Sequence, residues 1–338
     1  MSSSLSPASR AASADAAPTS PSLAALTPTR RLLVAIAFWG NLVCQMGIIV
    51  TGGVVRLTGS GLGCSTWPNC EPGQFSPTTS NPTGFRAFIE FGNRSLTGVL
   101  SIFAILLLVA AVAWLRFKGR SFVVLAIMPL VGTLVQAIVG MAIVKLDLHP
   151  GVVAPHFLIS IALVVVSTML VARLYEGDGP RRPAVPRPVL AVALALAVVG
   201  AAVLVLGTVV TSSGPHSGDA EATLRTGLDP RTVSWLHADS VMLFCGLLVG
   251  MLLVLHLIRA RTHARRAAWT LVVITVLQAV IGYTQYFTAL PAVLVGFHMA
   301  GAALFTASIT WLVTTMWTWQ GAPMSNAETT ARTIEVTP

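Results

Sequence analysis

Three histidines lie inside long apolar segments of the chain, where an ionisable side chain is costly and is therefore a candidate for function. His156, His237 and His298 each lie about five to seven residues from the start of such a segment, so helices that begin at one membrane face would place all three imidazoles about 8–10 Å below it. A neutral imidazole between helices is a good ligand for haem iron, and His237 and His298 are positioned to bind one haem from both sides. Hydrogen bonding between helices is the alternative role for one buried histidine, but three at a common depth favour haem.

A fourth apolar segment carries a different polar set at about the same depth. Glu90, Asn93 and Arg94 have the spacing i, i+3 and i+4, which places them on one face of a helix. Glu90 can act as a general acid or base, and Arg94 can pair with it or with a haem propionate. A purely structural ion pair between Glu90 and Arg94 is the alternative. Asn93 lies within a residue or two of the position that His237 holds later in the chain, and it cannot ligate iron as an imidazole does, so His156 is the one clear iron ligand of the first half.

Eight apolar segments position these residues. The chain is 54% hydrophobic and 10% charged, whereas a soluble domain carries roughly a quarter charged residues, so lipid must be the solvent for most of it. Each segment has about 20 residues or more, enough to cross a hydrocarbon core of about 30 Å. The sequence predicts an all-α polytopic membrane protein with transmembrane helices near residues 31–53, 88–115, 121–144, 151–174, 188–211, 232–258, 267–287 and 291–317.

The positive charges indicate orientation rather than nucleic-acid binding. The net charge is +9, but the basic residues form short clusters between apolar segments, with no continuous basic patch. Alternate loops hold most of the Lys and Arg, which predicts that both termini are cytoplasmic in a multi-pass protein of the cell membrane. The loop with Cys64 and Cys70 then faces outward, where a disulfide can persist; two free thiols are the alternative.

An internal repeat divides the segments into two sets of four. Gln136 is followed 20 residues later by His156, and Gln278 is followed 20 residues later by His298, with an offset of 142 residues for both pairs. Each set crosses the membrane an even number of times, so the two halves have the same orientation. We therefore expect two tandem four-helix bundles, at 30–175 and 188–318, between disordered cytoplasmic tails at 1–29 and 319–338.

These residues together resemble the haem A synthase family. The segment from Gly52 to Cys70 looks like the cysteine-pair loop of that family, and Glu90-Phe-Gly-Asn93-Arg94 is similar to its Glu-x-x-His-Arg motif. His156, His237 and His298 match its other three histidine positions. The resemblance covers about residues 31–317.

The resemblance implies an activity and roles for these residues. The protein would oxidise the C8 methyl group of haem O to a formyl, giving haem A. His237 and His298 would ligate a haem b cofactor, His156 would ligate the substrate haem in the catalytic N-terminal half, and Glu90 would act in catalysis. Cys64 and Cys70 would form a redox-active or loop-fixing pair. The implied partners are membrane lipid, haem O synthase and an electron-transfer partner.

Asn93 departs from the family pattern, which commonly has histidine there, so the substrate iron has either an open position or another ligand. Two other functions compete with a haem-modifying enzyme. A di-haem electron-transfer cytochrome would use the same histidines, but it would not need Glu90 beside an incomplete ligand set. A transporter should have helices broken near the membrane centre, and here the polar layer lies near one face.

Overall fold

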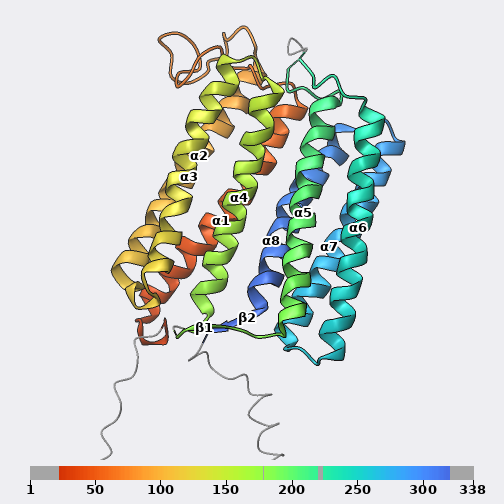
Figure 1. The fold of residues 1–338 in the computed structure, drawn as a ribbon. Coiled ribbons are helices and arrows are strands. Elements are labelled where there is room, and N and C mark those ends of the chain that lie inside the picture. The colour runs from red at the N-terminus through yellow and green to blue at the C-terminus, as the bar shows by residue number, and fades with distance from the viewer. Residues whose placement is uncertain (1–22, 178, 220–223, 320–338) are drawn as a thin grey trace, which may run out of the picture.

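Eight long helices dominate the structure, a computed structural model that describes residues 23–177, 179–219 and 224–319. Each is long and apolar enough to cross a membrane, which confirms the all-α polytopic prediction. In Figure 1, α1–α4 and α5–α8 form two neighbouring groups. The helices are α1 (Pro28–Leu57), α2 (Phe85–Trp114), α3 (Arg120–Lys145), α4 (Pro150–Tyr175), α5 (Arg187–Ser213), α6 (Pro230–Leu257), α7 (Thr262–Phe287) and α8 (Ala292–Thr315). Short 3-10 helices η1 (Leu23–Ala25) and η2 (Arg116–Lys118) and strands β1 (Arg181–Pro183) and β2 (Trp317–Trp319) complete it.

Most of the helices extend beyond the apolar segments that predicted them, and α1 and α6 do so through capped first turns. α1 begins at Pro28, and the backbone N–H of Arg30 donates to the Thr27 hydroxyl at 3.4 Å. α6 begins at Pro230, and the Asp229 carboxylate accepts from the backbone N–H of Thr232 at 2.9 Å. A proline at the first helical position and a side-chain cap before it both favour helix initiation. Hydrophobicity alone does not register these turns.

The ordered part of the chain also extends into the two predicted tails. Residues 1–22 and 320–338 lie outside the described residues, but the prediction of disorder is wrong for the residues next to the helices. Leu23 and Leu26 pack against the apolar core of the first half. Trp319 pairs with Arg181 in the antiparallel β1–β2 ladder, and the Arg173 guanidinium lies 3.6 Å from the centroid of its indole. Apolar burial and cation–π contact therefore order both tail segments.

The two ends of the molecule differ in packing. We call the end with loops 58–84 and 214–229 the loop end, and the end with β1 and β2 the strand end; they are the top and bottom of Figure 1. Large buried side chains concentrate toward the strand end in both halves. Phe38 of α1 stacks on Phe122 of α3 at 5.8 Å between ring centroids, and Met251 and Leu312 are fully buried in the second half. The apolar cores thus hold the helices together at one end and leave the other end to the polar residues.

The backbone repeats the relation that the sequence predicted. Two consecutive residues with positive φ, Asp147 and Leu148, connect α3 to α4, and Ala289 and Leu290 connect α7 to α8 in the same way. The residues of the two turns are separated by the predicted 142 positions. Non-glycine residues rarely adopt this conformation, so its occurrence in both turns supports a repeated four-helix unit.

The two halves meet along α1 and α4 of the first and α8 of the second. At the loop end, Arg56 at the end of α1 reaches into the second half and donates to the backbone carbonyls of Thr211 at 3.0 Å and His216 at 2.8 Å. The backbone N–H of Gly61 donates to the carbonyl of Gly218 at 2.8 Å. The loops of the two halves therefore fix each other's position at the loop end.

Candidate functional site

The three intramembrane histidines form a layer near the loop end. His156, His237 and His298 follow the first residues of α4, α6 and α8 by six or seven positions. At about 1.5 Å per residue they lie about 9–10 Å from the starts of these helices. The Nδ1 atoms of His156 and His298 are buried and have no hydrogen-bond partner among the described residues, whereas the His237 ring has the backbone of Val203 as a partner. A buried polar atom without a partner is uncommon in a folded protein, and a bound group explains it.

His237 and His298 face each other in the second half. Their ring centroids are 6.5 Å apart and their planes make an angle of 77°. An imidazole nitrogen lies about 1 Å from its ring centre and binds a transition metal at about 2 Å, so two imidazoles on opposite sides of one metal ion have centroids about 6 Å apart. The spacing of His237 and His298 therefore fits two axial ligands of one haem iron.

A glycine on the preceding helix makes room for each imidazole. A Cβ atom at Gly207 of α5 would lie 3.3 Å from Cε1 of His237, and one at Gly282 of α7 would lie 3.3 Å from Cε1 of His298. The corresponding distance from Gly140 of α3 to His156 is 3.8 Å. A side chain at Gly207 or Gly282 would press on its ring, so His237 and His298 each occupy a gap that a glycine leaves, whereas a Cβ atom at Gly140 would make only ordinary contact with His156.

The repeated glutamines support two of these histidines from behind. Nε2 of Gln136 donates to the backbone carbonyl of His156, and Nε2 of Gln278 donates to that of His298, both at 2.9 Å. Gln136 also bonds the Ser160 hydroxyl. The matched spacing in the sequence thus corresponds to one structural device that fixes the backbone beneath a candidate ligand.

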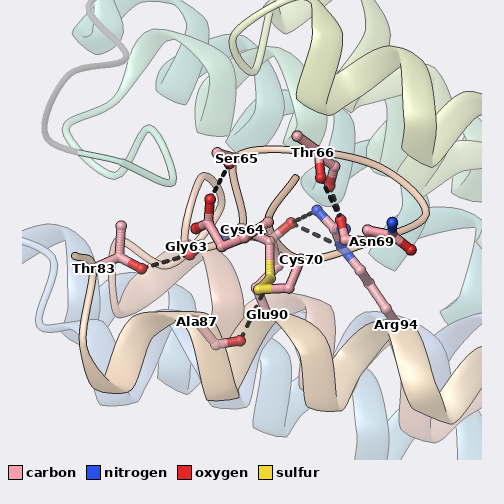
Figure 2. A network of polar contacts seen from close by, with 11 residues as sticks. Gly63, Cys64, Ser65, Thr66, Asn69, Cys70, Thr83, Ala87, Glu90 and Arg94 are labelled. Carbon is pink, nitrogen blue, oxygen red and sulfur yellow. Dashed lines mark hydrogen bonds and ion pairs between the residues drawn. A yellow bond between two sulfur atoms is a disulfide. The ribbon is translucent and has the colours of Figure 1, made fainter. Parts of the chain in front are cut away.

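Glu90 and Arg94 form a buried ion pair on the first half, and the cysteine loop covers it (Figure 2). Arg94 donates to Oε1 of Glu90 through Nε at 3.0 Å and also through its second nitrogen. Oε2 of Glu90 accepts from the backbone N–H of Cys64 at 2.8 Å. Glu90 is only 5% exposed. The pair that was one interpretation of this motif is therefore present, and it is joined to a loop rather than isolated.

The cysteine loop is closed by a disulfide, as one of the two interpretations predicted. Cys64 and Cys70 are bonded, with their Cα atoms 4.4 Å apart, and both are fully buried. Arg94 donates to the carbonyl of Thr66 at 2.7 Å, a contact to the loop that sequence reasoning missed (Figure 2). The i, i+4 spacing of Glu90 and Arg94 predicted their pairing, but nothing in the sequence indicated that loop carbonyls share the guanidinium.

Asn93 lies apart from this network, although it is on the same helix. Its Oδ1 accepts a hydrogen bond from the Thr51 hydroxyl of α1 at 2.7 Å. No hydrogen bond or ion pair joins His156 to Glu90 or Asn93 in the part of the chain that the structure describes. Sequence reasoning did not single out Thr51. The available signal was its place directly before Gly52-Gly-Val-Val55 of α1, which aligns with Gly207-Thr-Val-Val210 of α5 and makes Gly52 the repeat counterpart of Gly207.

The remaining four histidines have hydrogen-bond partners away from the layer. The backbone N–H of Gly151 donates to Nδ1 of His149, and Nε1 of Trp311 donates to Nε2 of His263. His216 and His256 contact backbone carbonyls of Leu290 and Leu252. These contacts give each of them a structural role outside the layer.

Comparison with known proteins shows to which family this chain belongs. The sequence profile of a family described as cytochrome oxidase assembly protein matches residues 35–216. Haem A synthases of Listeria welshimeri and Listeria monocytogenes are each 34% identical to this chain over 140 residues, which is 41% of this chain and 44% of theirs. The haem A synthase of Halalkalibacterium halodurans is 29% identical over 282 residues, covering 80% of this chain and 90% of its own. Because the profile matches more than half of the chain, the protein belongs to this cytochrome oxidase assembly family, that of the haem A synthases.

Proposed function

We propose that this protein is a haem A synthase, which oxidises the C8 methyl group of haem O to a formyl and so produces haem A. One observation carries the proposal: the two halves share a frame, but only the first places a buried carboxylate, Glu90, on the helix that lacks an imidazole ligand. A protein that only transfers electrons between two haems has no need of that carboxylate. The enzyme interpretation accounts for the difference between the halves.

The C-terminal half would hold haem b as a resident cofactor between His237 and His298. Bound haem supplies one-electron redox chemistry, and two imidazole ligands suit electron transfer because the coordination need not change. The orphaned Nδ1 atom of His298 and the 6.5 Å separation of the rings support this role. Gln278 would keep His298 in place through the backbone carbonyl that it bonds.

The N-terminal half would hold the substrate haem through His156. Turning a methyl group into a formyl is a four-electron oxidation that replaces two C–H bonds by one C=O bond. Water or dioxygen supplies the oxygen atom, the electrons pass to the electron-transfer partner or to dioxygen, and protons are released, so the site needs a proton-accepting group. The Glu90 carboxylate is the candidate, because it is buried beside Arg94 and faces the backbone of Gly63 and Cys64 in the loop above it. Arg94 would position the carboxylate and the disulfide loop would exclude water above it.

The proposed orientation places the loop end outside the cell membrane and both termini in the cytoplasm. The distribution of Lys and Arg supports it, since the loops at the strand end carry most of the positive charge. The reaction also requires haem O synthase or another source of haem O, and an electron-transfer partner. A reporter fused at the C-terminus that is active only in the cytoplasm tests the orientation.

The direct test is expression in a host that makes haem O but not haem A, followed by pigment extraction and mass analysis. We expect haem A in cells that carry the wild-type chain. Glu90→Gln should bind haem and yield at least about 100-fold less haem A. If the wild-type protein binds two haems and the extract contains only haem O and haem b, the di-haem cytochrome replaces the enzyme.

A further inference from the structure

The two halves differ in the space opposite their shared histidine position. In the second half, a Cβ atom at Gly207 would meet the ring of His237 at 3.3 Å. In the first half, Gly52 is the counterpart of Gly207, and a Cβ atom there would have no atom within 4 Å. The imidazole that fills this gap in the second half is thus replaced by the shorter Asn93 and open space. The second half therefore has two facing imidazoles that would hold one iron, and the first half has an amide where the second of these imidazoles would be.

The side chain of Asn93 is held in one orientation by α1. The Thr51 hydroxyl lies 2.7 Å from Asn93 Oδ1 and 3.3 Å from the carbonyl of Ile48, so its single proton belongs to the shorter contact. Because the Thr51 proton engages the amide oxygen, the amide NH₂ is left as a donor. That nitrogen has no hydrogen-bond partner among the described residues. The arrangement presents a fixed donor at the place where the second half presents a ligand.

A groove leads to this donor from the side of the helix pair. It lies between α1 and α2 near the loop end, has a volume of about 320 Å³, and is lined by Thr51 and Asn93 together with Phe85, Phe88 and Ile89. Phe85 is 77% exposed, so the groove opens on the surface of the bundle. A small molecule can therefore reach the amide without passing the disulfide loop.

We propose that Asn93 is a hydrogen-bond donor to a small ligand in the iron position opposite His156, and that Thr51 is the positioning residue that orients its amide. The proposal rests on the proposed function, in which His156 holds a haem in the first half. The ligand class is a small molecule whose oxygen atom accepts a hydrogen bond. The N-terminal half is then an open, donor-equipped haem site, and the C-terminal half is a closed one.

Carbon monoxide tests this directly on the full-length protein saturated with haem and reduced. We expect one carbon monoxide for every two haems, and an infrared stretching band lowered by the donor. Asn93→Leu removes the donor, and Thr51→Val leaves the Asn93 amide free to rotate away from the ligand. Both variants should therefore move the band to higher wavenumber. Thr51→Ser keeps the hydroxyl and should leave the band in place. Asn93→His should give a second low-spin haem and lose carbon monoxide binding.

The outcomes separate this inference from the function on which it rests. One haem per chain in both the wild type and His156→Ala would overturn the N-terminal haem site and this inference together. Two haems without carbon monoxide binding would overturn only the open position. Carbon monoxide binding with the same band in the wild type, Asn93→Leu and Thr51→Val would overturn the role of Asn93 and leave the open position standing.

Discussion

The two halves of this protein have the same helical frame but present different groups from it. In the C-terminal half, His237 and His298 face each other at 6.5 Å between ring centroids. In the N-terminal half, the corresponding helix presents Asn93 bonded to Thr51, and it adds Glu90 and Arg94 beneath a disulfide-closed loop. A duplicated bundle can therefore keep its packing and turns while a few side chains at one level change the chemistry.

The largest effect is expected when one of the two facing imidazoles of the C-terminal half is removed. His298→Ala should weaken haem binding in that half by at least about 100-fold, because loss of a ligand costs more than loss of a group that only supports one. Haem content and the Soret absorbance of the purified protein measure it. His256→Ala is the matched control, since that imidazole bonds a carbonyl of its own helix. Unchanged haem content in His298→Ala would remove the assignment of the C-terminal site.

The next test acts on the group that only the N-terminal half has. Glu90→Gln keeps the shape of the side chain but removes its proton-accepting carboxylate, so turnover should fall by about 10²–10⁴-fold while both haems stay bound. The rate of haem A formation and the haem content are measured together. Glu71→Gln alters another carboxylate, in the loop 58–84, and should retain activity. Normal turnover in Glu90→Gln would show that Glu90 has only a structural role.

A smaller effect is expected from opening the loop that covers the first half. Changing Cys64 and Cys70 together to serine should lower the free energy of unfolding by about 2 kcal/mol, because the disulfide closes a short loop in the unfolded chain. Thermal unfolding in detergent measures the loss, with Cys44→Ala, at a free cysteine, as the control. The spectrum of the haem in the C-terminal half should not change. A lost spectrum would show that the halves are not independent at this level.

The smallest effects test the symmetry itself. Gln136→Leu and Gln278→Leu each remove a bond to a histidine carbonyl, which should cost about 0.6 kcal/mol in a membrane protein, and the two losses should add in the double variant. Gln136 has Ser160 as a second partner, so its loss should be slightly larger. Thermal unfolding of the three variants measures this. If Gln136→Leu strongly destabilises the protein and Gln278→Leu does not, the two glutamines do not have the same role.

Several features of the fold and the site follow from residue patterns. The eight spans were predictable because each apolar segment must match the thickness of a bilayer, and His156 and His298 were found through the repeat that connects them to Gln136 and Gln278. The exact ends of the helices and the ordered structure at Leu23 and Trp319 could not be predicted. Helix caps, apolar packing and the two-stranded ladder depend on contacts between residues distant in sequence.

What the sequence by itself determined is therefore the membrane class, the duplication, and the level at which polar residues lie, all of which depend on spacing along one chain. The sequence also predicted that His237 would face His298, and the structure gave their spacing. Only the tertiary structure decided the contacts outside this pair: it joined Glu90 to the backbone of Cys64 and turned Asn93 toward Thr51. The rotation of each helix about its axis sets those contacts, and that rotation comes from packing against several neighbours at once.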